Sequence, residues 1–378
     1  LDDSVAWYDD PVLMAGEADA EVIVELIGGA NGIALEVCNQ AFSSRRHVVT
    51  ANKALIALHG MTLAEIAENS GLSLNYEAAV AGGIPIIKAL REGLAGNELS
   101  GLYGIFNGTC NYILSTMRET GREFDDVLAD AQRLGYVEAD PSFDLDGIDT
   151  AHKLAILTGV AFGCRINFDG IAVEGIRYIT SQDIRFAEEL GYQIKLLGIT
   201  RRSNNGVEQR VHPCMVKQDS PIAHVDGVFN AVVANSNFAG STIYQGSGAG
   251  AGPTASAVAA DLVDIARGVQ TPVFSIAANK LMKLPTLAIE HHVGAYYIRL
   301  MVVDRPGVFA DVAAALRDED VSMESILQHT RAPGEPVPVV LTTHETEEAS
   351  LRRVIDRFEA FETVVETPCV IRIEPLAF

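Results

Sequence analysis

The first 80 residues alternate short apolar runs with amphipathic segments, and this alternation limits the folds that the chain can adopt. The apolar runs at 21–27, 47–50 and 72–76 predict short buried strands. The segments between them, 34–43 and 55–70, have the periodicity of helices. Strands that alternate with helices form parallel sheets with crossover connections. The N-terminal part is therefore predicted to be α/β, with a parallel sheet of the dinucleotide-binding type.

Residues 84–244 predict a second α/β unit with a different kind of sheet. Polar and apolar residues alternate along its predicted strands, which is typical of a mixed or antiparallel sheet with one face covered by helices. A linker is expected at 279–285. Strands are expected at 99–106, 172–176, 193–201, 207–217 and 225–235, and helices at 86–93, 111–120, 124–134 and 148–162.

Composition excludes several classes of function. The net charge of −22 argues against a nucleic-acid partner, because phosphate binding needs a basic face. No apolar run approaches the roughly 18 residues of a membrane-spanning helix, so no membrane partner is expected. The five cysteines include no C-x-x-C pair and are odd in number. This pattern fits neither a zinc site nor a disulfide framework, and it favours the reducing cytoplasm.

An acidic stretch ends at a single lysine, Lys153, where a Pro/Gly-broken loop enters an apolar helix. Asp149 and Lys153 are four residues apart at the predicted helix start, so they share one helical face. This arrangement suits a small cationic or amphoteric substrate held beside an ionisable amine. The alternative is an acidic loop that only favours the helix N-terminus. The carboxylates are Glu138, Asp140, Asp144, Asp146 and Asp149.

Six motifs in order give the chain a resemblance to a known family. They are LIGGANG, TANKALIA, YEAAVAGGIPIIKAL, GIFNGTCNYIL, LGYVEADPSFDLDGIDTAHKLAIL and GAGAGPTASAV. Together they resemble the homoserine dehydrogenases. The resemblance implies reversible hydride transfer between NAD(P)H and L-aspartate 4-semialdehyde, which gives L-homoserine in threonine, methionine and isoleucine biosynthesis. It also implies a cytoplasmic homo-oligomer.

The resemblance assigns substrate and proton-transfer roles within these motifs. Lys153 would give a proton to the carbonyl oxygen, and a desolvated lysine can have a pKa lowered towards the working pH. The alternative is that Lys153 is an ordinary lysine on a helix surface, without a role in proton transfer. Glu138 matches the carboxylate that binds the substrate ammonium. Asp149, Asp144 and Thr109 match positions at the substrate cleft, and the turn before Thr109 could also be a simple helix N-cap.

The cofactor is expected to be NADP or NAD. Lys53 follows a strand at the carboxyl edge of the predicted sheet, where ligands gather in open α/β folds, although it could be only a helix-entry lysine. By resemblance, Lys53, Gly28 and Gly135 would contact the cofactor.

A second glycine-rich segment, 246–251, formally matches G-x-G-x-x-A. The acidic residues after it lie on the following helix rather than at the end of a second strand, which argues against a complete mononucleotide fold starting here. A turn at Gly248 and Gly250 that approaches the cofactor is favoured, and a tight helix entry is the alternative.

Residues Glu77 to Ile84 resemble the family's monovalent-cation loop. The Glu77 carboxylate and the carbonyls of Val80, Gly82 and Ile84 would hold Na⁺, since hard oxygen ligands suit such an ion. A structural turn without an ion is the alternative.

The tail from residue 295 has the order strand–helix–strand–strand–helix–strand, a ferredoxin-like pattern. Its opening V-x-D-R-P-G-V-F, at 302–309, resembles an ACT domain, a small-ligand regulatory module. The resemblance implies an amino-acid effector, probable threonine feedback, and a site lined by Asp304, Gly307 and Val308, whose backbone N–H groups would face a carboxylate. The alternative is a packing or dimerisation appendage.

These expectations divide the chain into three parts. An NAD(P)-binding domain would comprise 1–83 and be completed by 245–285, a catalytic domain 84–244, and an ACT domain 291–378. No strand–GxGxxG–helix unit precedes residue 21, so the chain is expected to be N-terminally truncated relative to the family. A non-catalytic amino-acid-binding protein that cannot hold a dinucleotide stays open as the second function class.

Overall fold

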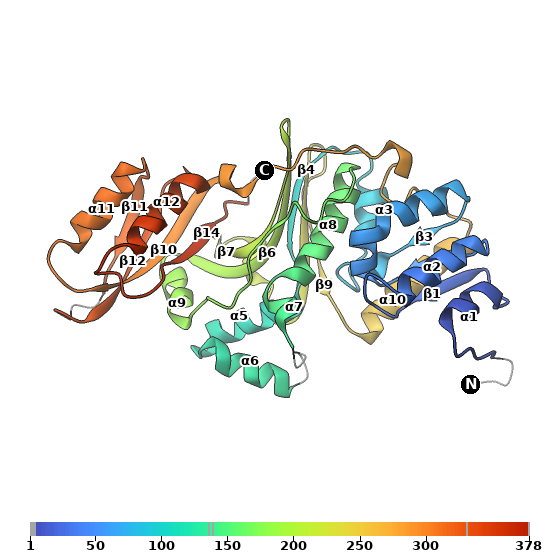
Figure 1. Cartoon of the computed structure of the whole chain (residues 1–378), viewed down its shortest axis with the longest axis horizontal. Helices are drawn as coiled ribbons and strands as arrows, with labels where there is room; N and C mark the ends of the chain where they lie inside the picture. The colour runs from blue at the N-terminus through green and yellow to red at the C-terminus, as the bar shows by residue number, and fades with distance from the viewer. Residues whose placement is uncertain (1–4, 135–136, 138–139, 330–331, 377–378) are drawn as a thin grey trace.

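The computed structural model describes residues 5–134, 137, 140–329 and 332–376, and its α/β units lie in a row (Figure 1). The N-terminal unit has a parallel three-stranded sheet in the order β1-β2-β3, as the alternating pattern predicted. Its strands and main helices are β1 (Val22–Glu25), α2 (Ile33–Ser43), β2 (His47–Thr50), α3 (Lys53–Asn69) and β3 (Leu74–Asn75), preceded by α1 (Pro11–Glu17).

A second, mixed sheet runs through the rest of the described chain in the order β11-β12-β10-β14-β7-β6-β4-β8-β9, with β5 beside β7 and β13 beside β10. Its catalytic half was predicted as mixed or antiparallel, and this is confirmed by the antiparallel pairs of β6 with β7 and of β4 with β8. The strands of this half are β4 (Leu99–Ile105), β5 (Ala172–Val173), β6 (Tyr192–Ser203), β7 (Gly206–Lys217), β8 (Phe229–Ser236) and β9 (Gly240–Ser247).

Helix α8 (Ile148–Phe162) connects the two sheets, because it packs on both α3 and β6 (Figure 1). It is apolar around most of its circumference and nearly all of its residues are buried, as expected for a helix between two layers. Gly147 and Gly163 bound it in left-handed conformations. The neighbouring helices are α4 (Ile86–Lys88), α5 (Gly108–Thr120), α6 (Phe124–Arg133), α7 (Ser142–Leu145), α9 (Ser181–Glu189) and α10 (Ala251–Ala266).

The tail has the predicted ferredoxin-like topology, with strand order β11-β12-β10-β14. However, its sheet is not separate: β14 pairs in parallel with β7, with Arg372 opposite Cys214. The tail and the catalytic unit therefore share one continuous sheet. The tail elements are β10 (Val293–Val303), α11 (Val308–Asp318), β11 (Met323–Leu327), β12 (Pro336–Thr343), β13 (Thr346–Glu347), α12 (Glu348–Glu359) and β14 (Cys369–Ile373).

Some local predictions differ from the structure. The strand expected at 172–176 shrinks to two residues, and the helix expected at 86–93 turns π-helical after Lys88. Helix α9 was missed although its start carries a capping box, in which Thr180 and Asp183 bond each other's backbone N–H groups. All five cysteines are buried and free, and no helix in the described ranges is long and apolar enough to cross a bilayer.

Candidate active site

Lys153 and Asp149 meet on α8 as their spacing predicted. Lys153 Nζ donates to Asp149 Oδ2 at 2.6 Å and to the Phe106 carbonyl at 2.7 Å. Both residues are buried, with Lys153 8 % and Asp149 2 % exposed. Phe106 directly follows β4. Its carbonyl therefore holds the Lys153 ammonium of the neighbouring helix α8 at the end of this strand.

A second ammonium reaches Asp149 from the other sheet. Lys53 is the first residue of α3, after β2, and its Nζ lies 2.5 Å from Asp149 Oδ1. The contact is an ion pair, since Oδ1 accepts no hydrogen bond of good geometry within the described residues. Lys53 also lies over the Phe143 ring, 5.5 Å from its centre. One carboxylate thus holds two ammonium groups from two α/β units.

Asn107 ties the acidic loop to this cluster, a role that the sequence did not reveal. Its Nδ2 donates to Asp144 Oδ1 at 2.8 Å and to Asp149 Oδ2 at 2.9 Å. Its Oδ1 accepts from Cys110 N and caps α5. This is the helix N-cap that was the alternative prediction for this turn. Thr109 is the second residue of α5 and lies in the turn that Asn107 caps. The side chain therefore both caps a helix and positions two carboxylates.

Burial and charge shift the ionisation of this cluster. For Asp149 burial, the largest effect, acts to raise the pKa, but the charges of Lys153 and Lys53 outweigh it and hold the pKa well below its usual range. For Lys153, burial lowers the pKa, the charge of Asp149 opposes this, and the charge of Lys53 adds to it. The cluster thus combines an ionised carboxylate with a lysine that releases a proton more readily than a solvated one.

His152 forms a buried aromatic stack beside the cluster. Its ring lies 4.5 Å from the ring of Phe168 and 5.5 Å from that of Phe143. Burial, the largest effect, lowers the pKa of His152 against the opposing charge of Asp149, so the ring is neutral near pH 7. His152 is 6 % and Phe143 42 % exposed, so the stack extends from the interior to the surface.

The glycine-rich turn at Gly248 contacts the lysine site through Asn230. Asn230 on β8 is buried and donates to the same Phe106 carbonyl at 3.0 Å, while its Oδ1 has no partner within the described ranges. A Cβ at Gly248 would lie 2.1 Å from Asn230 Cγ, so only glycine fits. Gly250 precedes α10 at a φ of +118°. The turn thus packs on the amide that shares the Phe106 carbonyl with Lys153, and no motif or spacing marks Asn230 as a site residue.

Gly28 lies at the carboxyl end of β1, next to the strand that precedes Lys53. Its N–H donates to the Glu25 carboxylate, and a Cβ there would meet open space. Asn52, the residue before Lys53, donates to the Gly29 carbonyl at 2.6 Å. The loop with Gly28 and the start of α3 are therefore joined at one edge of the parallel sheet.

The predicted cation loop packs directly against the glycine-rich turn. Each Glu77 carboxylate oxygen accepts a backbone N–H, from Ile87 at 2.8 Å and from Lys88 at 3.0 Å. Burial, the largest effect, raises the pKa of Glu77 to about 7. These bonds give the turn a structural role without an ion. Val80, Gly82 and Ile84 follow in the same buried loop, and Gly83 N donates to the Ser247 carbonyl at 3.0 Å.

The predicted effector residues lie at the far end of β10. Asp304 Oδ2 accepts from Ala332 N at 2.8 Å, which holds the facing loop. Gly307 has a φ of +103° and caps α11, whose first residue is the buried Val308. The structure does not bring this loop near Lys153. Gly135 and Glu138, two further predicted site residues, lie outside the described residues.

Comparison with known proteins matches two family models: homoserine dehydrogenase over residues 85–263 and the ACT domain over 296–363. The chain is 48 % identical to a homoserine dehydrogenase of Pseudomonas aeruginosa, over 96 % of this chain and 85 % of that protein. It is 45 % identical to a homoserine dehydrogenase of Neisseria gonorrhoeae, over 99 % of this chain and 87 % of that protein.

Solved structures agree with these matches. The crystal structure of a homoserine dehydrogenase from Thiobacillus denitrificans is similar with a TM-score of 0.92 and 46 % identity, covering 98 % of this chain and 85 % of that one. A hyperthermophilic archaeal homoserine dehydrogenase in complex with NADPH is similar with a TM-score of 0.63 and 28 % identity. This match covers 72 % of this chain and 79 % of that one. The chain therefore belongs to the homoserine dehydrogenases, oxidoreductases that act on a CH–OH group, and it carries a C-terminal ACT domain.

Proposed function

We propose that this chain interconverts L-homoserine and L-aspartate 4-semialdehyde with NADP or NAD, as a step towards threonine, methionine and isoleucine. The observation that carries this proposal is the buried contact of Lys153 with Asp149 and the Phe106 carbonyl. This contact supports the proposal, because a buried lysine with a lowered pKa beside carboxylates suits an amino-acid substrate whose oxygen changes charge.

The surrounding residues fit a dinucleotide. The Gly28 loop lies at the carboxyl edge of a parallel sheet, where a Cβ would meet nothing within 4 Å, and the Gly248 turn packs its backbone directly on Asn230. Buried Asn230 Oδ1 offers an acceptor to an amide or ring donor. We assign Gly28, Lys53, Gly135, Gly248 and Gly250 to the cofactor, whose nicotinamide would supply or accept the hydride. The archaeal homoserine dehydrogenase in complex with NADPH supports the choice of NADP or NAD as the cofactor.

The chain's own residues handle the proton. In the direction of aldehyde reduction, the Lys153 ammonium gives one proton to the oxygen as it gains negative charge, and it takes that proton back in the oxidation direction. Asp149 keeps the lysine charged and in place through the 2.6 Å bond. Lys53 neutralises the second carboxylate oxygen, so Asp149 stays ionised although it is buried.

The substrate is assigned to the acidic loop. Glu138 would bind its ammonium group, because a carboxylate is the partner that a cationic amine needs. Asp144 and Asp149, joined by Asn107, would form the polar wall of the cleft, and Thr109 its edge at the start of α5.

Regulation and organisation complete the proposal. Threonine would bind the ACT loop at Asp304, Gly307 and Val308, and the enzyme would work as a cytoplasmic homo-oligomer. We assign 1–83 with 245–285 to cofactor binding, 84–244 to catalysis and 291–378 to regulation. The hydrogen bond from Tyr76 to the Val273 carbonyl, 2.6 Å long, supports the joining of 245–285 to the N-terminal unit. Sodium at the Glu77 loop remains a prediction.

The test is the rate of NADPH and of NADH oxidation with aspartate 4-semialdehyde, with and without threonine. Turnover that threonine suppresses supports both the activity and the regulatory role. The ratio of the two rates gives the cofactor preference. If neither cofactor is oxidised, even after an N-terminal strand–GxGxxG–helix unit is fused to the chain, the amino-acid-binding alternative is favoured instead.

A further inference from the structure

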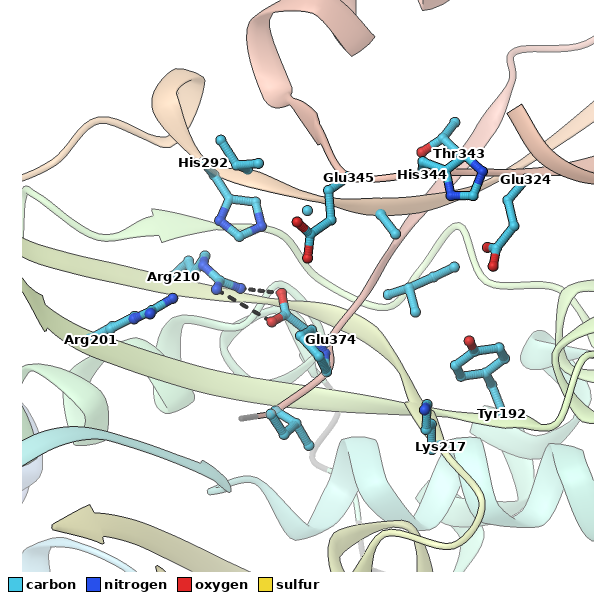
Figure 2. A pocket seen from close by; sticks show the side chains of 16 residues that line it. Tyr192, Arg201, Arg210, Lys217, His292, Glu324, Thr343, His344, Glu345 and Glu374 are labelled. Carbon is cyan, nitrogen blue, oxygen red and sulfur yellow. Dashed lines mark hydrogen bonds and ion pairs between the residues drawn. The ribbon is translucent and has the colours of Figure 1, made fainter. Parts of the chain in front are cut away.

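A cavity of about 250 Å³ lies where the ACT sheet joins the catalytic sheet, and we call it the seam pocket (Figure 2). One wall comes from the tail, from the ends of β10, β12 and β14. The opposite wall comes from β6 and β7 of the catalytic unit. The pocket therefore exists only because the two units share one sheet.

The floor of the seam pocket is a closed ion network. Buried Arg210 donates to Glu374 on the segment after β14 and to Glu208 Oε1 at 2.8 Å. Glu208 Oε1 also lies 2.9 Å from His292 Nδ1. Arg210 pairs with both carboxylates, so the network fixes the shape of the floor.

Glu324 on β11 lines one wall and accepts a hydrogen bond from the Thr342 hydroxyl at 3.3 Å, and two further charged side chains on the walls have no partner among the described residues. Lys217 ends β7 on the catalytic side, and Glu345 follows β12 on the ACT side; Figure 2 shows them on opposite walls. Within the described residues, neither side chain makes a hydrogen bond or an ion pair. A cation and an anion face the same cavity without partners.

We propose that the seam pocket binds a free α-amino acid, with its carboxylate towards Lys217 and its ammonium towards Glu345. A small zwitterion meets both uncompensated charges at once, whereas a simple anion or a simple amine meets only one. The volume agrees, because it lies below the roughly 300–1,000 Å³ typical of pockets for larger ligands. A bound amino acid would link the two halves of the sheet.

This site differs from the ACT loop at Asp304 that is assigned to the effector. The pocket lies at the Val293 end of β10 and the loop lies beyond Val303. At about 3.3 Å per residue, the strand separates them by roughly 33 Å. Binding at the seam pocket also does not depend on catalysis, so it can fail or succeed independently of the proposed reaction.

The test is calorimetric titration of the full chain with each of the twenty L-amino acids, followed by the N-acetyl and carboxamide forms of any that bind. We expect at least one to bind, and Lys217→Ala and Glu345→Gln each to weaken that binding by roughly tenfold or more. The N-acetyl and the carboxamide forms should each bind roughly tenfold or more weakly than the free amino acid, as the two variants do. Lys283→Ala, another exposed lysine, and Asp304→Ala, in the ACT loop, should leave this binding unchanged.

Two results would overturn the proposal. One is that no amino acid binds at all. The other is that all binding is lost in Asp304→Ala and kept in Lys217→Ala and Glu345→Gln, which would assign it to the ACT loop. Because Lys217 and Glu345 are exposed, their variants should fold normally, and circular dichroism verifies this.

Discussion

The ammonium nitrogen of Lys53 lies 2.5 Å from Oδ1 of Asp149, and this contact joins the N-terminal parallel sheet to the buried helix of the catalytic unit. The other oxygen of Asp149 accepts from Lys153 at 2.6 Å. A single carboxylate is thus shared between Lys53 at the start of α3 and Lys153 on α8. Changing that carboxylate should alter the ionisation of Lys153.

Asp149→Asn should move the pH dependence of aldehyde reduction to lower pH. The charge of Asp149 raises the pKa of Lys153 against the larger effect of burial, so its loss lowers that pKa further. Because reduction needs the protonated lysine, the rate should begin to fall at lower pH than in the wild type. The measurement is kcat for NADPH oxidation between pH 6 and 10. If kcat declines at the same pH in Asp149→Asn as in the wild type, the charge of Asp149 does not set the pKa of Lys153.

Gly248→Ala should damage the site by displacing Asn230. The new Cβ would lie 2.1 Å from Asn230 Cγ, and the buried amide can move only by leaving the Phe106 carbonyl. We expect kcat to fall on the order of 10²-fold, the usual effect of a misplaced reacting group. Gly252→Ala is the matched control, since a Cβ there meets nothing within 4 Å. Equal activity of the two variants would contradict the role of Asn230.

Glu77 makes the predicted sodium site testable by stability. Burial raises its pKa to about 7, above the roughly 4.3 of an unfolded chain. The folded state therefore holds more protons between these values, and stability falls as pH rises through this window. A bound Na⁺ needs the ionised form and should offset this fall.

The measurement for the sodium site is the melting temperature in NaCl and in choline chloride of equal ionic strength. With a sodium site, NaCl should stabilise the protein at pH 8 and less at pH 6, and Glu77→Gln should remove the difference. Identical melting temperatures in both salts at pH 8 would leave the loop as the structural turn that the bonds to Ile87 and Lys88 describe.

Arg372→Met should destabilise the joint between the ACT and catalytic sheets. Arg372 on β14 donates to buried Glu348 at 2.9 Å and to Glu174 at 2.8 Å. Its removal leaves buried Glu348 with only the Tyr296 hydroxyl and the Arg352 guanidinium at 3.6 Å, at a cost of up to about 3–5 kcal/mol of unfolding free energy. Arg353→Met removes one of the two arginines that pair with Glu319 near the surface, and it should destabilise the protein much less. Urea unfolding compares them, and equal losses would contradict a structural role for the joint.

The sequence predicted what local periodicity and motif spacing can encode. The parallel N-terminal sheet, the ferredoxin-like tail and the Asp149–Lys153 contact all follow from positions close together in the chain. It did not predict contacts that only the tertiary fold creates. The pairing of β14 with β7, the Lys53–Asp149 ion pair and the place of Asn230 join segments far apart in sequence, and no composition or spacing signal marks them.

Helix α9 is a different case, because its capping box was present in the sequence and overlooked.

The most direct test of the central claim is kcat of Lys153→Ala for NADPH oxidation by aspartate 4-semialdehyde, with Lys283→Ala as control. We expect a fall of roughly 10²–10⁴-fold, the usual contribution of general acid catalysis, with an unchanged circular dichroism spectrum. The control should keep wild-type turnover. A loss of less than about tenfold in Lys153→Ala would contradict proton transfer by Lys153.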